Sequence, residues 1–286
     1  MMRLRHTAVL CVSVLIAVFA VRPADGRDLK FGFTPFLSEA EMQTEFEPVM
    51  TYLSDAIGQK VVLYIAKDYG DLRTQMESGS VDIGSFSPFA YVDAVRGGKV
   101  RIIAQSTLDG SATYRGVIVA RKDSGLKTVT DLRGKRFAFV DPKSASGCLY
   151  PRAMLIEKGI TPESYFGETV FAGGHDKVIA AVLEGRADAG AIYEGALEIA
   201  RAKGVPTGNL VTLARTDLIP HDAITVRIGL DEALAKKIQA ALVDMDKSEA
   251  GHRVLVNSKP KKLTGYVLAE DSLFDVVRRT AKIAGM

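Results

Sequence analysis

The chain has 286 residues, 47% of them hydrophobic and 25% charged, with a mean hydropathy of +0.10. This composition excludes a disordered or collagen-like chain, and the length suits roughly two domains. The net charge of +3 is too balanced for a nucleic-acid-binding protein that relies on bulk charge. With two cysteines, a disulfide framework and a cysteine-rich zinc site are also excluded.

Residues 1–26 are predicted to be a secretory signal peptide. Arg3 and Arg5 give a basic start, an apolar run covers 7–21, and Ala24–Gly26 offers small residues for a cleavage site near residue 26. A membrane anchor is disfavoured, because such a run is shorter than the roughly 20 residues that span a bilayer. We therefore expect an exported protein that resides in the periplasm.

The first half of the remaining chain alternates strands and helices. Periodicity predicts strands over 29–33, 60–66, 81–85, 100–106 and 114–121, and helices over 39–57, 69–77 and 88–96. The alternation restarts near residue 131. It predicts strands over 136–140, 187–193, 210–214 and 223–226, helices over 149–158, 176–184, 195–203, 231–246 and 272–284, and a segment over 164–172 that leads into the second of these helices. This rhythm predicts the α/β fold class.

Two segments resemble each other. Glu77–Gly84 and Glu184–Gly190 both end a helix with glycine and enter a strand through Asp-x-Gly. A coincidence of common turn chemistry would explain this, and the alternative is a pair of similarly built lobes. That alternative predicts lobe I over 27–121 plus 223–286 and lobe II over 122–222, joined by two crossovers with a cleft between them.

Enzyme motifs are absent from the sequence. It lacks the glycine-rich nucleotide loops, the zinc protease motif and the serine hydrolase elbow, and its four histidines lack metal-ligand spacing. Cys148 and His175 form a conceivable nucleophile–base pair, with Asp176 or Asp222 orienting the base. A buried, inert Cys148 is the favoured interpretation. We expect a protein that is not an enzyme and has no metal or cofactor.

The loops after the predicted strands suit an anion. Beyond strand 136–140, Ser144 and Ser146 precede a helix whose first turn holds Pro151. Free backbone N–H groups at such a position, together with two hydroxyls, favour an anion, whereas simple capping by serine explains the same residues. Ser87 repeats the arrangement. In open α/β sheets, ligands bind beyond the carboxyl ends of the strands.

Several motifs occur in an informative order. They are Lys67-Asp68-Tyr69, Asp82-Ile83-Gly84, Ser111-Ala112-Thr113-Tyr114, Asp141-Pro142-Lys143-Ser144-Ala145-Ser146-Gly147, Gly174-His175 and Leu218-Ile219-Pro220-His221-Asp222. In this order, over about 29–270, the chain resembles the phosphonate-, phosphite- and phosphate-binding periplasmic proteins, the solute receptors of a class of ABC importers. The resemblance implies a type II periplasmic-binding-protein fold, in which two α/β lobes on a two-crossover hinge close over the ligand.

The resemblance also implies roles for residues. Ser144, Ser146 and nearby amides hold the phosphonyl oxygens, Tyr69 and Tyr114 occupy the aromatic positions, and His175 donates to an oxygen. Carboxylates at Glu194 and Asp222 match positions that hold a ligand ammonium in aminoalkylphosphonate binders. Alternatively, Glu194 only caps a helix and Asp222 accepts from a protonated oxyanion. The full predicted ligand site is Tyr69, Ser87, Tyr114, Ser144, Ser146, Gly147, Cys148, His175, Glu194 and Asp222.

Two departures from the family pattern bear on the ligand. Ala145 stands where relatives often have threonine, and Cys148 follows the loop glycine. Some relatives sense arsenic oxyanions, and a thiol suits arsenite. The sequence therefore predicts a receptor, monomeric like its class, that captures a phosphonate, phosphite or phosphate and hands it to an ABC permease. The alternative is an oxyanion sensor that docks on a histidine-kinase ectodomain.

Overall fold

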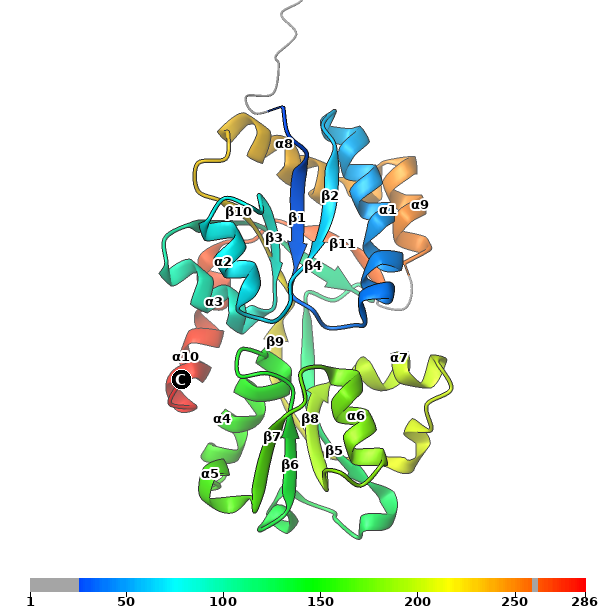
Figure 1. Cartoon of the computed structure of the whole chain (residues 1–286), viewed down its shortest axis with the longest axis vertical. Helices are drawn as coiled ribbons and strands as arrows, with labels where there is room; N and C mark the ends of the chain where they lie inside the picture. The colour runs from blue at the N-terminus through cyan, green and yellow to red at the C-terminus, as the bar shows by residue number, and fades with distance from the viewer. Residues whose placement is uncertain (1–25, 259–261) are drawn as a thin grey trace, which may run out of the picture.

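The chain folds into two α/β lobes, each built on its own sheet (Figure 1). The computed structural model describes residues 26–258 and 262–286. Residues 1–25 of the predicted signal peptide therefore lie outside the described residues. Among the described helices, none is long and apolar enough to cross a bilayer.

The lobe I sheet has the strand order β11-β4-β10-β3-β1-β2. Its strands are β1 (Leu29–Phe33), β2 (Val61–Ile65), β3 (Ile83–Phe86), β4 (Val100–Leu108), β10 (Ala223–Arg227) and β11 (Leu263–Val267). Helices α1 (Glu39–Ile57), α8 (Glu232–Val243) and α9 (Glu249–Val256) share one hydrophobic cluster with this sheet, while α2 (Asp71–Glu77) and α3 (Pro88–Arg96) belong to another. The sheet is therefore covered on two faces, as its mostly apolar strands require.

The lobe II sheet has the order β7-β6-β8-β5-β9. Its strands are β5 (Thr113–Arg121), β6 (Arg136–Phe139), β7 (Glu168–Phe171), β8 (Ala189–Tyr193) and β9 (Leu210–Pro220), and its helices are α4 (Tyr150–Glu157), α5 (Pro162–Tyr165), α6 (His175–Leu183) and α7 (Ala196–Ala202). A π-helical turn over Ala145–Leu149 leads into α4. The carboxyl ends of β6 and β8 thus lead into the segments that face lobe I (Figure 1).

The strand pairing corrects the predicted lobe boundary. The prediction placed 114–121 in lobe I, but β5 pairs with β8 and β9 in the lobe II sheet. The first crossover is the short connection 109–112, and the second is His221–Asp222 between β9 and β10. A strand that follows another after four residues looks locally like its hairpin partner, and only long-range pairing shows that it belongs to the other sheet.

The predicted secondary structure agrees with most observed elements within a few residues. The strand predicted over 210–214 continues to Pro220, where β9 pairs with β5 along its length. The prediction lacked α5, α9 and β11, and the helix predicted over 231–246 ends at Val243. β11 is an edge strand whose only partner is β4, so its five residues lack the continuous apolar pattern of a buried strand.

The two Asp-x-Gly motifs form the same hydrogen bonds in the two lobes. The Asp82 carboxylate accepts from the backbone N–H of Lys30 at 3.0 Å, and Asp188 accepts from that of Arg136 at 2.8 Å. In return, the Asp82 and Asp188 N–H groups donate to the carbonyls of the same two residues. Each carboxylate also pairs with arginine side chains. The shared pattern favours two similarly built lobes over a coincidence of turn chemistry.

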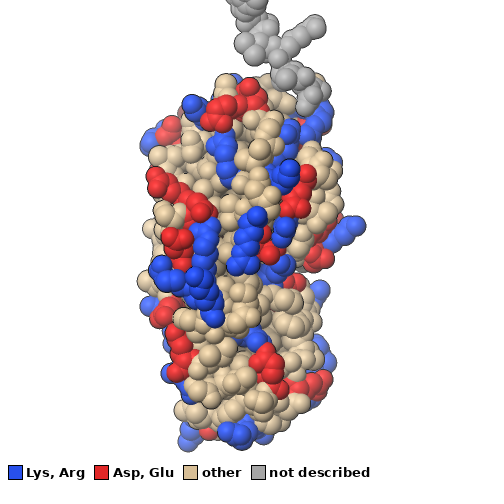
Figure 2. Space-filling view, turned by 90° about the vertical axis from the view of Figure 1, so that its left-hand side faces the viewer, with Lys and Arg blue, Asp and Glu red and all other residues tan. Residues whose placement is uncertain are grey.

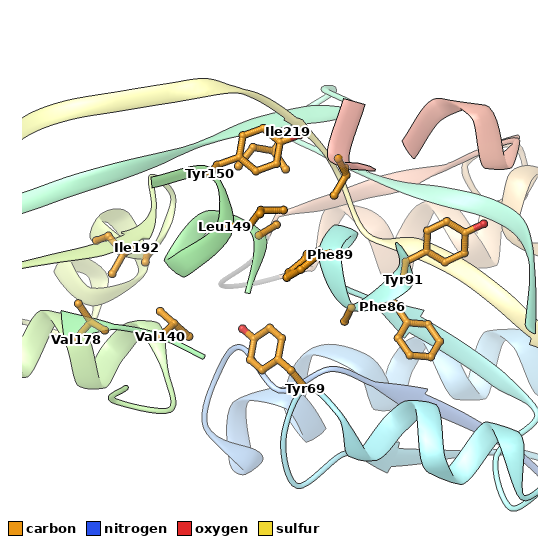
Figure 3. Packing of buried hydrophobic residues seen from close by; sticks show 14 of the residues in the cluster. Tyr69, Phe86, Phe89, Tyr91, Val140, Leu149, Tyr150, Val178, Ile192 and Ile219 are labelled. Carbon is orange, nitrogen blue, oxygen red and sulfur yellow. The ribbon is translucent and has the colours of Figure 1, made fainter. Parts of the chain in front are cut away.

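The lobes pack against each other through apolar side chains. One cluster contains Tyr69 and Phe89 of lobe I together with Leu149 and Ile219 of lobe II (Figure 3). The C-terminal helix α10 (Asp275–Ile283) contacts both α3 and α4, so it also bridges the lobes. Basic and acidic side chains alternate over the face in Figure 2, as the balanced net charge leads one to expect.

Candidate functional site

A cavity of about 60 Å³ lies between the lobes. That is several times the roughly 10–15 Å³ that one water molecule needs, so a small oxyanion fits. Lobe I lines it with Thr34, Phe36, Tyr69 and Ser87; lobe II with Ser144, Ala145, Ser146, His175 and Tyr193; and the ends of the crossovers with Leu108, Tyr114, His221 and Asp222.

Seven of the ten predicted ligand residues line this cavity. They are Tyr69, Ser87, Tyr114, Ser144, Ser146, His175 and Asp222. The structure brings them together because each follows or begins a strand at the edge of a sheet that faces the cleft. Gly147, Cys148 and Glu194 are not in the wall.

The π-helical turn after β6 presents the two serines. Ser144 Oγ accepts a hydrogen bond from the Gly147 N–H at 3.1 Å, so Ser144 does cap this turn. Gly147 is packed so closely that an added Cβ would lie 2.4 Å from the Val140 side chain. Its role in the structure is thus to let the turn pack against Val140. The same turn is thus capped by Ser144 and places Ser146 in the cavity wall.

Two buried tyrosines reach these serines. Tyr69 lies close to Ser144 of the opposite lobe, and Tyr114 lies close to Ser146. Burial raises the pKa of both tyrosines above the ordinary range, with the charge of Asp222 adding to the shift. Both phenols are therefore neutral hydroxyls at physiological pH. The Tyr114 ring stacks on His221, with centroids 4.8 Å apart.

His175 and Tyr193 form a second group of polar side chains in the wall. His175 Nδ1 accepts from the backbone N–H of Tyr193 at 3.2 Å, so in the neutral ring Nε2 carries the proton and is a donor. The Tyr193 hydroxyl is buried and has no hydrogen-bond partner within the described residues. Burial also raises the pKa of Tyr193, which keeps this hydroxyl protonated. Tyr193 therefore offers an unused donor beside His175.

The predicted ligand site lacked six residues of the wall, namely Thr34, Phe36, Leu108, Ala145, Tyr193 and His221. Tyr193 ends β8 and Thr34 follows β1, which is the sheet edge where ligands bind. This position was the available signal for both residues. Nothing local marks Phe36, whose ring contacts that of Phe46 edge-on.

Asp222 is the one charged side chain that lines the cavity in the described part of the chain. The other polar side chains of the wall carry hydroxyl or imidazole groups, which are able to donate hydrogen bonds. A carboxylate in a cavity wall repels nearby negative charge and attracts protonated or cationic groups.

Two predicted ligand residues point elsewhere, which corrects the prediction. Glu194 Oε1 accepts from Arg215 Nε at 2.9 Å, and its side chain is 46% exposed. Cys148 is 1% exposed and packs in the lobe II core with Ile118 and Phe139. Burial raises the pKa of the Cys148 thiol to about 12. Within the described residues, no group of three or more His, Cys, Asp or Glu side chains is placed to hold a metal ion.

Comparison with known proteins identifies the family. Residues 31–274 match the family model described as the periplasmic substrate-binding protein of phosphonate ABC transporters. The chain is 28% identical over 269 residues to the phosphate-import protein PhnD of Mycolicibacterium smegmatis, covering 88% of this chain and 84% of that one. It is also 28% identical over 233 residues to the phosphonates-binding periplasmic protein of Escherichia coli, covering 79% and 69% of the two chains.

A solved structure shares the fold. PhnD1 of Prochlorococcus marinus, in complex with methylphosphonate, superposes with a TM-score of 0.80 at 21% identity and covers 90% of this chain and 98% of its own. This likeness supports the type II periplasmic-binding-protein fold. Since the family model spans nearly all the described residues, the chain belongs to the phosphonate-binding family of periplasmic substrate-binding proteins of ABC transporters.

Proposed function

We propose that this protein captures a phosphorus oxyanion, namely a phosphonate, phosphite or phosphate, in the interlobe cavity and delivers it to an ABC importer. The observation that carries the proposal is the cavity wall, in which Ser144 and Ser146 lie beside Tyr69, Tyr114 and His175. Hydroxyl and imidazole donors converging on one small cavity suit tetrahedral oxygens. The protein would act as a periplasmic monomer after removal of residues 1–26.

The wall also selects the charge state of the ligand. The carboxylate of Asp222 would accept a hydrogen bond from a protonated oxygen and would repel a fully ionised oxyanion. A monoprotonated phosphonate or phosphate therefore fits better than a dianion. Recognition of a ligand ammonium by two carboxylates is not supported, because Glu194 pairs with Arg215 instead.

Binding would be coupled to closure of the lobes. Tyr69 contacts Ser144 across the cleft, and the Ser87 hydroxyl lies 3.5 Å from the Lys143 carbonyl oxygen in the other lobe. A ligand held by both lobes shifts the equilibrium towards the closed form. Closure would then present one surface to the permease only when cargo is bound.

A thermal-shift panel tests the proposal. The mature protein, refolded free of carried-over ligand, is assayed with phosphate, phosphite, methylphosphonate, 2-aminoethylphosphonate, arsenate and arsenite. A ligand at about 100 times its Kd stabilises by roughly 2.7 kcal/mol, which is a shift of several degrees for a chain of this size. The Ser146→Ala and His175→Ala variants should each bind more weakly by about 1–3 kcal/mol.

The outcomes separate the alternatives. No shift with any phosphorus compound would overturn the proposal, and unchanged affinity in both variants would show that the site is elsewhere. A shift with arsenite alone would support the sensor alternative. The burial of Cys148 argues against that result, because a thiol inside the lobe II core cannot reach a ligand in the cavity.

A further inference from the structure

A second cavity lies directly beside the interlobe cavity. It encloses about 80 Å³, and Phe36, His175 and Tyr193 line both cavities. The rest of its wall comes mainly from the loop before α1 and from α6 and α7, with the apolar side chains Leu37, Ile179, Ala180, Ala196, Ile199 and Val205. The three shared side chains show that the two cavities adjoin, and we call the second one the side cavity.

The lining of the side cavity suits an apolar ligand group. Its charged lining residues are Asp176 and Lys203, and both are exposed. Lys203 also forms an ion pair with Glu41 of α1. These charges therefore lie towards solvent, whereas Ile179, Ile199 and the alanines of α6 and α7 form the inner wall.

The side cavity is closed by both lobes. Phe36 and Leu37 come from lobe I, and α6 and α7 come from lobe II. A group placed there is thus enclosed by the same movement that would enclose the oxyanion. A phosphonate carries its organic substituent on phosphorus through a P–C bond, so oxygens held at the Ser144–Ser146 turn leave the substituent to extend past the shared side chains.

We propose that the side cavity holds the substituent and that the cargo is an alkylphosphonate with an apolar chain of two or more carbons. This inference rests on the proposed function and narrows its ligand class. Inorganic phosphate and phosphite leave the side cavity unused. An aminoalkylphosphonate would place an ammonium against the apolar inner wall, where losing its hydration is costly.

Isothermal titration calorimetry with a homologous series tests this inference. The ligands are methyl-, ethyl- and propylphosphonate, with 2-aminoethylphosphonate as the cationic counterpart of propylphosphonate at equal length. We expect affinity to rise about fourfold for each added methylene and propylphosphonate to bind at least about tenfold more tightly than 2-aminoethylphosphonate. Binding of methylphosphonate itself reports on the oxyanion site.

Two leucine variants locate the effect. Ala180 is half-buried in α6 and lines the side cavity, so Ala180→Leu fills it and should flatten the series. Ala202 is exposed on α7, so Ala202→Leu should keep the wild-type series. Circular dichroism checks that each variant folds, and the wild-type series decides the question even if Ala180→Leu does not fold.

The outcomes distinguish this inference from the proposed function. If methylphosphonate binds but affinity is flat or falls with chain length, the inference is overturned and the proposed function stands. Tighter binding of 2-aminoethylphosphonate than of propylphosphonate also overturns it. If none of the phosphonates binds, and phosphate and phosphite also fail, both fall together.

Discussion

Lys143 Nζ lies 2.5 Å from Asp93 Oδ2, and this ion pair joins the loop before the Ser144–Ser146 turn to α3 of the opposite lobe. Two more ion pairs cross the cleft, Lys203 with Glu41 and Lys262 with Glu198 at 3.3 Å. These ion pairs between the lobes can form only while the two lobes lie together.

Asp93→Asn should loosen the closed form. A partly exposed ion pair contributes about 0.5–1 kcal/mol, so we expect ligand affinity to fall roughly two- to fivefold, measured by calorimetry. The radius of gyration of the ligand-free protein should also increase in X-ray scattering. Asp123→Asn is the matched control, because Asp123 pairs with Arg121 within lobe II. Equal affinity in all three proteins would show that the Lys143 pair does not contribute to closure.

Acid should open the cleft. Burial raises the pKa of Asp93 and of Glu41, but hydrogen bonds and charge from Lys143 and Arg73, and from Lys203 and Ser38, outweigh it and lower both pKa values. A carboxyl with a lowered pKa stabilises the paired form above its ordinary pKa and loses this effect as pH falls through the lowered value.

We therefore expect the radius of gyration to rise as the pH falls from about 5 to about 3. The same expansion should occur at neutral pH in high salt, which screens exposed pairs. A protein that stays compact under both conditions would contradict this prediction.

Tyr193→Phe should lower the affinity for the ligand while raising the free energy of unfolding of the ligand-free protein. The mutation removes a buried hydroxyl that has no partner within the described residues, so the ligand-free protein should gain up to about 1 kcal/mol in its free energy of unfolding. If the hydroxyl donates to the oxyanion, affinity falls by about 1–3 kcal/mol.

Tyr266→Phe is the matched control for that variant. The Tyr266 hydroxyl is likewise buried without a partner in the described chain, but it lies in the lobe I cluster and outside the cavity wall. Its removal should leave affinity unchanged. Unchanged affinity in Tyr193→Phe as well would mean that Tyr193 only shapes the cavity.

Cys148→Ser should affect stability and leave binding intact. The thiol packs among Phe139, Ile118 and Leu155, so a hydroxyl there is placed in an apolar core and costs about 1–3 kcal/mol in the free energy of unfolding. Denaturant unfolding measures the loss, and Cys148→Ala separates the lost volume from the added polarity. Because the thiol pKa is about 12, a thiol reagent should label the native protein slowly. Loss of affinity in the folded serine variant would be inconsistent with this placement.

The sequence by itself determined the features that depend on neighbouring residues. The α/β alternation follows from local periodicity, and 29–33, 39–57 and 88–96 were predicted with the observed bounds. The similarity between Glu77–Gly84 and Glu184–Gly190 was visible because each Asp-x-Gly motif performs a local task at the start of a strand. Seven residues of the cavity wall follow from motif order and from their places at the ends of strands.

Only the tertiary structure decided the features that depend on distant partners. β5 belongs to lobe II because β8 and β9 pair with it. Glu194 lies outside the cavity wall, where its carboxylate accepts a hydrogen bond from Arg215 of β9. Cys148 lies within the same turn as the cavity-lining Ser146, yet its side chain packs in the lobe II core. The side cavity forms where α6 and α7 meet the loop before α1. Side-chain direction and the closure of two lobes on each other depend on contacts between segments far apart in the chain, and no local pattern records them.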